Sequence, residues 1–214
     1  MAKKITIEVS DSEAVKQYGD KIIFEIPVDR VKDLFDKKVK LASVPVGETF
    51  KIDDEEWIVL EQSGDTTACL RKDLLLVKFK FDDTTNNFSK SYINHFLNAH
   101  YAQKLLKLVG NNLCVHSVDL TSDDGLKDYG ICKQVYVSLL TCEQYRKYTD
   151  IMLKYNPKQW WWLATAYSTP TRGYRECVRA VLSDGTLSDN VCYSDGGGVR
   201  PVILLNNLLH VDEV

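Results

Sequence analysis

The sequence predicts an α+β protein with mostly antiparallel strands, two main helices and a long irregular C-terminal segment. Three observations lead to this prediction. Short runs that alternate hydrophobic and polar residues recur along the chain, as they do in half-buried strands. Brief turn sequences separate these runs, and such short connections join antiparallel strands. Two longer segments, 91–101 and 141–152, carry the hydrophobic spacing of amphipathic helices instead.

The length of the chain indicates its domain organisation, and its net charge limits the classes of partner that it is expected to bind. The chain has 214 residues, which suits a main domain at 42–214 and an N-terminal appendage at 1–41. Its 27 Lys+Arg and 30 Asp+Glu give a net charge of -3, which argues against nucleic acid as the main partner. No apolar run approaches the length of a membrane span, so we expect no membrane insertion. The N-terminal segment lacks the apolar stretch of a secretory signal, so we expect a cytoplasmic or virion-associated protein.

The cysteines and histidines show no metal-binding spacing. The chain has 6 Cys and 4 His, without a C-x-x-C pair, an H-E-x-x-H sequence or paired Cys/His spacing. We therefore expect no metal site and no cofactor. Reduced thiols are the default for a chain without a secretory signal, and Cys177 with Cys192 is the one pair that we consider for a disulfide.

Within the appendage, alternating residues predict strands at 5–9 and 22–26. Asp29 is suited to cap a short amphipathic helix, and the basic run 37–40 suits the C-terminus of that helix. If the chain forms an oligomer, we expect this appendage to mediate it.

The next part of the chain predicts an antiparallel meander. A strand at 46–52 is followed by a turn at Asp53-Asp54 and a returning strand at 57–60, which together form a hairpin. A second turn at 63–65 leads into a strand at 67–70.

A helix is expected after the polar loop at 82–87, and either Ser89 or Ser91 is suited to cap it. His95 and His100 lack the i,i+4 spacing of metal ligands, so we interpret both as surface or core-edge residues. The core face of this helix is expected to consist of Tyr92, Ile93, Phe96, Leu97 and Tyr101.

The middle of the chain predicts a loop, a strand and a second helix. The polar stretch 121–128 is typical of a loop, and 135–140 has the composition of a strand. Thr141 and Gln144 have the spacing of a capping box, which predicts a helix that runs toward Met152.

The composition of the sequence changes at the three tryptophans 160–162, after which small and polar residues predominate. We assign these tryptophans to the core because aromatic side chains dominate cores. Strands are expected at 178–182 and 187–193 around a strong turn signal. Three glycines at 196–198 then break the pattern before an apolar terminal strand at 199–205.

The sequence contains no pattern that supports catalysis. The glycines at 196–198 lack the lysine and the spacing of a phosphate-binding loop. No histidine lies between His116 and His210, and no serine occurs in G-x-S-x-G, so a nucleophilic triad is not indicated. Asp184 and Asp195 stand beside glycines, where turn formation explains them better than a carboxylate pair. We therefore predict that the protein is not an enzyme.

Three C-terminal motifs resemble a large bacterial and phage domain family. Trp161-Trp162-Leu163 is similar to the start of its W-W-L-R-S-P-G segment. Ser183-Asp184-Gly185-Thr186 is similar to its S-D-G-S turn, and Gly198-Val199-Arg200-Pro201-Val202 to its terminal G-V-R-P strand.

Earlier segments agree with this resemblance, which covers about residues 44–206. The hairpin at 46–60 is similar to the opening hairpin of the family, and Ser91–Asn98 to its S-x-L-R-x-W-L-N helix. The resemblance implies a C-type lectin-like fold, shared with formylglycine-generating-enzyme-like domains. The same fold occurs in variable proteins of diversity-generating retroelements, such as the phage major tropism determinant.

The sequence departs from the family in the segment that would bind a ligand. Residues 164–167 replace the R-S-P-G of the family, and a mixed set of side chains surrounds the turn at 183–186. Such a mixture fits adenine-directed diversification by a retroelement, and it fits ordinary drift as well. The resemblance then implies that exchangeable side chains bind a protein or glycan at a cell or phage surface.

The ligand-binding surface implied in this way is rich in Tyr and Arg, which offer large contact areas. We expect about half of these tyrosines and arginines to be buried or structural instead. The implied surface consists of Ala164, Ala166, Tyr167, Thr171, Arg172, Tyr174, Arg175, Arg179, Ala180, Leu182, Asp189, Cys192, Tyr193 and Asp195.

Three hypotheses follow. The first is a non-enzymatic variable protein of a diversity-generating retroelement, and the second is an undiversified structural or interaction domain of the same fold. The third, with least support, is an oxidase that resembles the formylglycine-generating enzyme and uses Cys177 and Cys192 in one copper site. The residues that flank these two cysteines do not clearly match the motif of that enzyme.

Overall fold

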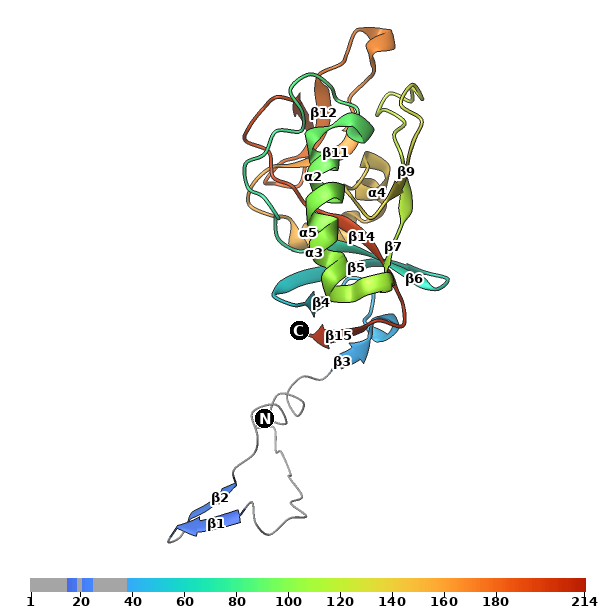
Figure 1. Cartoon of the computed structure of the whole chain (residues 1–214). Coiled ribbons are helices and arrows are strands. Elements are labelled where there is room, and N and C mark those ends of the chain that lie inside the picture. Colours follow the sequence, from blue (N-terminus) through green and yellow to red (C-terminus); the bar gives the residue numbers. More distant parts are fainter. Residues whose placement is uncertain (1–14, 19–20, 25–37) are drawn as a thin grey trace. The chain divides into compact units, whose positions relative to one another are not determined.

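The structure is a computed structural model in which the chain divides into two units, Met1–Lys37 and Lys38–Val214 (Figure 1). The residues that it describes are 15–18, 21–24 and 38–214. The division falls earlier than the boundary expected after residue 41, because Lys38–Lys40 forms strand β3 and pairs with β15 (His210–Glu213). Residues 38–40 of the basic run, which was expected to end a helix, are therefore a strand. Its alternation explains this result, since only the middle residue of Lys-Val-Lys is partly buried.

The first unit contains an antiparallel pair of strands. Strand β1 (Val15–Tyr18) pairs with β2 (Lys21–Phe24), and β2 coincides with much of the strand expected at 22–26. The strand expected at 5–9 and the helix expected after Asp29 lie outside the described residues.

Most strands of the second unit form one antiparallel sheet with the order β10-β14-β6-β5-β4-β15-β3, and β7 pairs with β14 beside this path. The meander predicted between residues 46 and 70 is confirmed as β4–β5–β6, in which Phe50 pairs with Trp57. The remaining strands of this sheet are β4 (Thr49–Ile52), β5 (Glu55–Ser63), β6 (Thr66–Arg71), β7 (Leu113–Cys114), β10 (Val137–Ser138) and β14 (Val202–Asn206).

Two smaller antiparallel sheets complete the strands. One contains β8 (His116–Asp119) and β9 (Ile131–Val135), and the other contains β11 (Trp161–Ala166), β12 (Cys177–Val181) and β13 (Leu187–Val191) in that order.

The single strand expected at 135–140 is wrong, because the chain changes sheets there. Asn98 Oδ1 accepts hydrogen bonds from the backbone N–H groups of Tyr136 and Val137 at 2.9 and 3.2 Å. The backbone therefore leaves β9 and continues as β10 in the main sheet.

The first helical segment comprises α2 (Tyr92–Phe96), a π-helical turn (η4, Leu97–Tyr101) and α3 (Ala102–Val109) in succession. Ser91 Oγ caps α2 by accepting from the N–H of Asn94 at 3.2 Å, so of the two serines suited to this role Ser91 is the cap. Tyr92 was wrongly placed on the core face: it is 50% exposed, and its hydroxyl donates to Asp83 Oδ2 at 3.1 Å.

The second helical segment comprises α4 (Cys142–Lys147) and α5 (Thr149–Tyr155), and the predicted capping box between Thr141 and Gln144 is confirmed. Among the described residues, no helix is both long and apolar enough to cross a membrane. Short 3₁₀ turns occupy Leu41–Ser43, Phe88–Lys90, Gly110–Asn112 and Pro170–Arg172.

The tryptophans of β11 explain why this strand is buried on both faces. Trp162 belongs to the larger hydrophobic cluster with Phe50 and Trp57, whereas Trp161 belongs to a second cluster with Tyr145 of α4. Neighbouring residues of a strand point to opposite faces, so the two rings reach two different cores. Both are 0% exposed, which confirms their assignment to the interior.

The glycines at 196–198 are required by this packing. A Cβ at Gly197 would overlap the indole of Trp162, and a Cβ at Gly198 would crowd Leu74. The segment therefore passes close beneath the side chains of Trp162 and Leu74 before β14 begins.

Arg200 ties the terminal segment to two other parts of the chain. It is 0% exposed, and its guanidinium donates to the backbone oxygens of Arg71, Lys72 and Tyr155 at 2.9, 3.0 and 2.9 Å. The guanidinium also lies 5.2 Å from the ring centroid of Trp161. A buried cation with this set of partners acts as a structural clamp.

Candidate functional site

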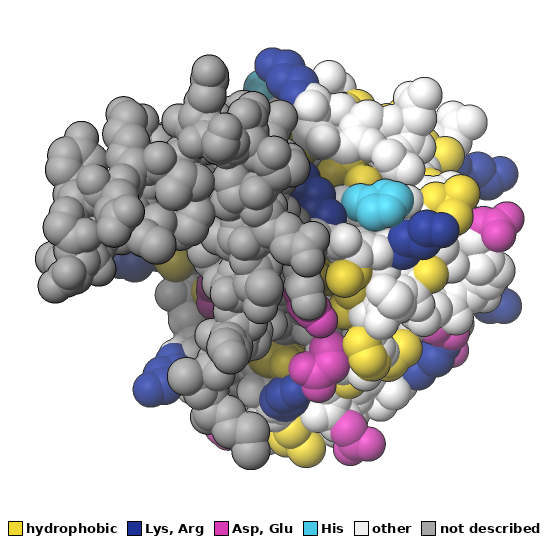
Figure 2. Space-filling view, turned by 90° about the horizontal axis from the view of Figure 1, so that it is seen from below, with side chains coloured by type: hydrophobic (Ala, Val, Ile, Leu, Met, Phe, Trp, Pro, Cys, Tyr) yellow, Lys and Arg dark blue, Asp and Glu magenta, His cyan; other side chains and the backbone are white. Residues whose placement is uncertain are grey.

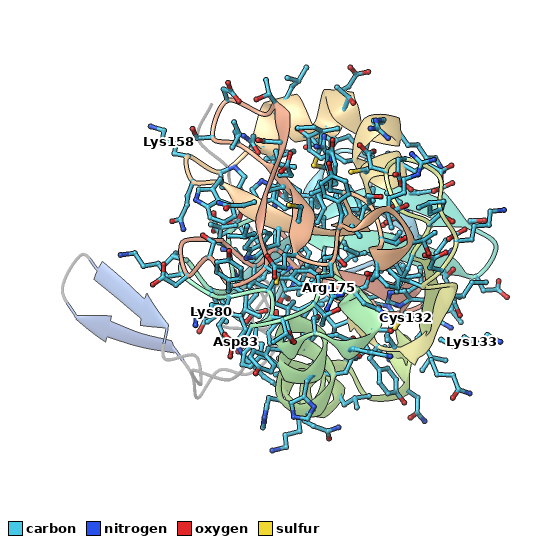
Figure 3. All side chains as sticks on the ribbon, turned by 90° about the horizontal axis from the view of Figure 1, so that it is seen from above. Lys80, Asp83, Cys132, Lys133, Lys158 and Arg175 are labelled. Carbon is cyan, nitrogen blue, oxygen red and sulfur yellow. The ribbon has the colours of Figure 1, made fainter. Side chains whose placement is uncertain are left out.

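The loop between β11 and β12 carries an exposed group of aromatic and basic side chains, which we call the Tyr–Arg surface: Tyr167, Arg172, Tyr174 and Arg175. The rings of Tyr167 and Tyr174 pack with centroids 5.4 Å apart and remain 38% and 46% exposed. Arg172 and Arg175 are exposed in the same loop, and Arg175 is labelled in Figure 3. The group offers a contact area in which two large rings already support each other.

Buried hydrogen bonds hold the backbone beneath the Tyr–Arg surface. Asn86 is 0% exposed, and its Nδ2 donates to the backbone oxygens of Ser168 and Cys177, each at 2.9 Å. Its own N–H donates to the backbone oxygen of Arg175 at 2.8 Å. The hydroxyl of Tyr129 completes the arrangement by donating to Asn86 Oδ1 at 2.5 Å. One buried amide therefore fixes both ends of the loop.

A neighbouring acidic segment, part of the loop expected at 121–128, binds the side chains of the same loop. Asp124 accepts from Ser168 Oγ at 2.6 Å and forms an ion pair with Arg172 at 3.2 Å. Asp128 accepts from Thr169 Oγ1 at 2.5 Å and also from Thr171. The hydrogen bonds from Thr169 and Thr171 lower the pKa of Asp128 below its usual range.

Arg179, in strand β12, lies close to the ring of Tyr167 in the Tyr–Arg surface and is held by two carboxylates. Its side chain is 12% exposed and forms ion pairs with Asp123 at 3.3 Å and Asp189 at 3.4 Å. Its guanidinium also lies 5.9 Å from the ring centroid of Tyr167. Asp123 in turn binds Arg146 of α4 at 2.8 Å. Arg179 and Asp189 are thus tied to each other, and Asp189 remains exposed.

Four residues of the implied surface lie in the interior, and their assignment to a ligand-contacting surface is wrong. Ala164, Ala166 and Ala180 are 1% exposed and Cys192 is 0% exposed. The two alanines of β11 are buried because the strand is covered on both faces. Ala180 pairs with Trp162, and Cys192 faces the larger core cluster.

Of the other residues of the implied ligand-binding surface, the structure places only some near the Tyr–Arg surface. Tyr193 lies beyond the end of β13 that is near the Tyr–Arg surface, because the N–H of Cys192 donates to the backbone oxygen of Glu176 at 2.7 Å. Asp195 lies two residues after Tyr193 in the chain and is exposed. Leu182, in contrast, is at the opposite end of β12.

Sequence reasoning missed the residues that hold this surface in place. Asn86, Asp124 and Asp128 stand in segments that the sequence identified only as polar loops. Turn preference alone explains such residues in a loop, so only their contacts with the segment at 168–177 show their role.

The two thiols proposed for copper do not share a site. Cys177 pairs with Val191, so these two side chains point to the same face of the sheet. Cys192 follows Val191 and points into the core with Val178. Burial raises the pKa of Cys192 to about 11 and raises that of Cys177 as well. Both cysteines are free thiols in this structure.

Charges of both signs are mixed on the face that Figure 2 shows, where Lys and Arg lie among Asp, Glu and hydrophobic side chains of the described residues. In the described part of the chain, no three residues among His, Cys, Asp and Glu are grouped so that they could hold a metal ion. The arrangement at residues 167–175 is suited to contact through rings, guanidinium groups and hydroxyls. No protein-family model, curated protein or solved structure matches the chain.

Proposed function

We propose that this protein is a non-enzymatic ligand-binding protein that displays its binding surface on a C-type lectin-like scaffold. We propose further that it is a variable protein of a diversity-generating retroelement from a phage or bacterium. Its partner is then a protein or glycan at a cell or phage surface, and the protein itself is cytoplasmic or virion-associated.

The Tyr167–Tyr174 pair carries this proposal. The two rings are exposed in the same loop as Arg172 and Arg175, and the backbone of this loop is fixed by Asn86. Tyr and Arg are the side chains that contribute most to binding when they sit on a rigid support. A fixed backbone also lowers the entropy that is lost on binding.

The separation of framework and surface supports the same proposal. Trp162, Gly197 and Arg200 hold the C-terminal segment through buried contacts. Tyr174 and Arg175 make no comparable contacts with the core and are exposed. Substitution at such positions is expected to change binding with little effect on folding.

One observation favours the second candidate, an undiversified interaction domain. Arg172 and Thr171 are bound by Asp124 and Asp128, so replacement of either would break an existing contact. A fixed surface would keep these pairs, whereas a diversified one would exchange them.

The proposal is tested by binding measurements on the full chain. The immobilised protein is exposed to purified surface proteins and glycans of candidate host cells, and each bound species is measured by interferometry. We expect Tyr174→Ala and Arg175→Ala each to weaken binding by about tenfold or more. Lys133→Ala, at an exposed position of β9, is the matched control and should bind as the unchanged protein does. Unchanged affinity in both surface variants would refute the proposal.

A further inference from the structure

A π-helical turn interrupts the first helical segment of the second unit. This turn, η4, lies between α2 and α3, and the three follow one another in a single helical column (Figure 1). At its end the N–H of Ala102 donates to the backbone oxygen of Leu97, five residues earlier. Such turns are rare within α-helices and occur frequently at functional sites, so the side chains that this turn brings together are of interest.

The π-helical turn brings the rings of His95 and His100 together. In a straight α-helix, two side chains that are five residues apart point about 140° away from each other around the axis. A π-helical turn uses more residues for each rotation, so this angle becomes smaller. The centroids of the two imidazole rings lie 6.0 Å apart, and both side chains are exposed. The i,i+5 spacing, which disfavours a pair in an ordinary helix, therefore forms one here.

Neighbouring side chains support one ring of this pair and balance a charge on the next helical turn. The ring of His100 packs against that of Phe96 with centroids 6.1 Å apart, and Phe96 packs against Phe79 at 5.4 Å. Lys104 follows His100 by one turn of the helix, and its Nζ donates to Glu55 Oε1 at 2.8 Å. Because this carboxylate balances the charge of Lys104, the lysine repels a cation at the histidine pair less strongly.

Two imidazoles at this separation are able to bind one metal ion. A metal–nitrogen distance of about 2.1 Å places the centroids of two rings on the same ion roughly 5 Å apart. A small rotation of the two exposed side chains therefore closes the distance. Once one ring has bound the ion, the second bond forms within the same molecule, which strengthens binding over that of a lone histidine.

The donor set decides which ions suit this pair. Neutral imidazole is a common ligand of Zn²⁺, Cu²⁺ and Ni²⁺, whereas Mg²⁺ and Ca²⁺ take oxygen ligands. Among the described residues, no third His, Cys, Asp or Glu joins a pair to complete a group that could hold a metal ion. Water therefore fills the other positions of the ion, and the site is open and exchangeable, unlike a structural zinc site with four protein ligands.

We propose that His95 and His100 form a two-histidine site for a divalent transition-metal ion of the Zn²⁺, Cu²⁺ and Ni²⁺ group. The site is created by the π-helical turn, because this turn places both rings on one side of the helix. It uses no residue of the Tyr–Arg surface, so it is independent of the function proposed for that surface.

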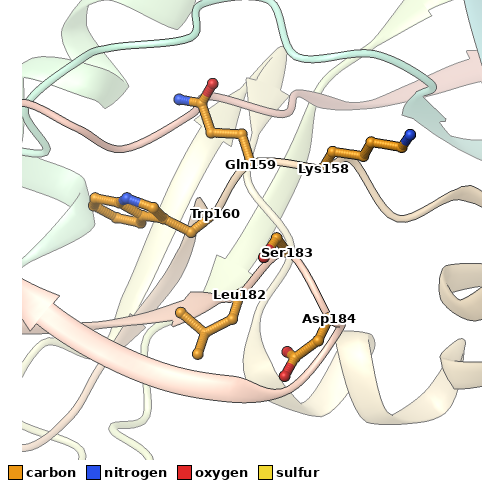
Figure 4. A pocket seen from close by; sticks show the side chains of 6 residues that line it. All are labelled: Lys158, Gln159, Trp160, Leu182, Ser183 and Asp184. Carbon is orange, nitrogen blue, oxygen red and sulfur yellow. The ribbon is translucent and has the colours of Figure 1, made fainter.

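Two lone donors elsewhere in the described part of the chain provide controls. His210 is exposed in β15 and pairs with Lys40 rather than with another metal ligand. Asp184 lines a hollow with Lys158 and Trp160, and these three side chains point away from one another (Figure 4). The residues that line this hollow include no second carboxylate, imidazole or thiol. Neither position is therefore expected to bind an ion through two side chains.

The test follows the imidazole signals of the full chain by NMR while ZnCl₂ is added at about pH 7.5, because an imidazole binds a metal only in its neutral form. His95→Gln and His100→Gln identify the two signals. We expect both signals to move together and to saturate with a dissociation constant of about 100 μM or lower. MgCl₂ should move neither signal. The absence of a saturable change in either ring, or saturation of the two rings at different Zn²⁺ concentrations, would overturn the proposal.

The single variants separate binding by the pair from binding by one exposed histidine. Glutamine is well tolerated at exposed helical positions, and far-UV circular dichroism checks that the helix is retained. In His95→Gln and in His100→Gln, we expect Zn²⁺ to bind the remaining ring about tenfold more weakly or less. His210→Gln and Asp184→Asn are the matched controls and should leave the affinity of the pair unchanged. If the remaining ring of both single variants bound Zn²⁺ as tightly as in the unchanged protein, the proposal would be wrong.

Discussion

Replacement of Arg200 tests whether the buried guanidinium holds the C-terminal segment. The side chain is 0% exposed and serves three backbone oxygens, those of Arg71, Lys72 and Tyr155. Arg200→Met keeps much of the length of the side chain but removes every donor. At about 1 kcal/mol for each buried oxygen left without its donor, the free energy of unfolding falls by about 3 kcal/mol.

Arg200→Lys provides the matched comparison, because it keeps the charge. Burial lowers the pKa of Arg200, since the charged form loses its hydration. A lysine would suffer the same desolvation and could not present the planar fork that reaches three oxygens. We therefore expect Arg200→Lys to destabilise the protein about as much as Arg200→Met, by about 3 kcal/mol.

Urea unfolding at neutral pH, followed by tryptophan fluorescence, measures both variants. The midpoint and slope give the free energy of unfolding, with Lys133→Met as an exposed control. A loss of less than about 0.5 kcal/mol in both variants would contradict the structural role assigned to Arg200, since changes of that size are typical of exposed positions. A large loss in Arg200→Met with none in Arg200→Lys would show that charge alone matters and that the geometry does not.

Three further predictions concern stability. Burial lowers the pKa of His116 to about 4, below the value of about 6.5 for an unfolded chain, so the unfolded state takes up the proton first. The contribution of neutral His116 to the free energy of unfolding is therefore full above about pH 6.5 and is lost as pH falls toward 4, by at most about 3 kcal/mol. His116→Gln should remove this decrease from a plot of the free energy of unfolding against pH. A plot that is the same for His116→Gln and the unchanged protein would refute this prediction. Gly197→Ala forces a methyl group against Trp162, and we expect a loss of about 2 kcal/mol or more in urea unfolding; a neutral effect would contradict the close packing. Thr141→Ala breaks the capping box of α4 and should cost about 1 kcal/mol, whereas Thr141→Ser should recover most of it.

The parts of the fold that depend on local sequence could be predicted. The β4–β5 hairpin, the Ser91 cap and the Thr141–Gln144 capping box all rest on contacts within a few residues. The pairing of β3 with β15 joins residues from the two ends of the second unit, and no local pattern indicates such a partner. The same reason explains the error at 135–140, where the distant side chain of Asn98 redirects the chain.

The candidate site was predictable only in part. Tyr167, Tyr174 and Arg175 are exposed, as expected from their position in a long polar segment. The burial of Ala164 and Ala180 depends on what covers β11 and β12, and this information is not contained in the segment itself. Asp124 and Asp128 were missed for a related reason, since their partners lie more than forty positions away in sequence.

Sequencing of the 3′ end of the gene and its flanking DNA across a growing population tests the central proposal most directly. The proposal predicts substitutions at adenine-templated positions in the codons of exposed residues such as Tyr174 and Arg175. The codons of the buried residues Ala164, Ala180 and Cys192 should keep small side chains, because larger ones would disrupt the core. A near-identical repeat and a reverse transcriptase gene should lie nearby. A uniform 3′ end without such a repeat would contradict the diversification and leave an interaction domain with a fixed surface.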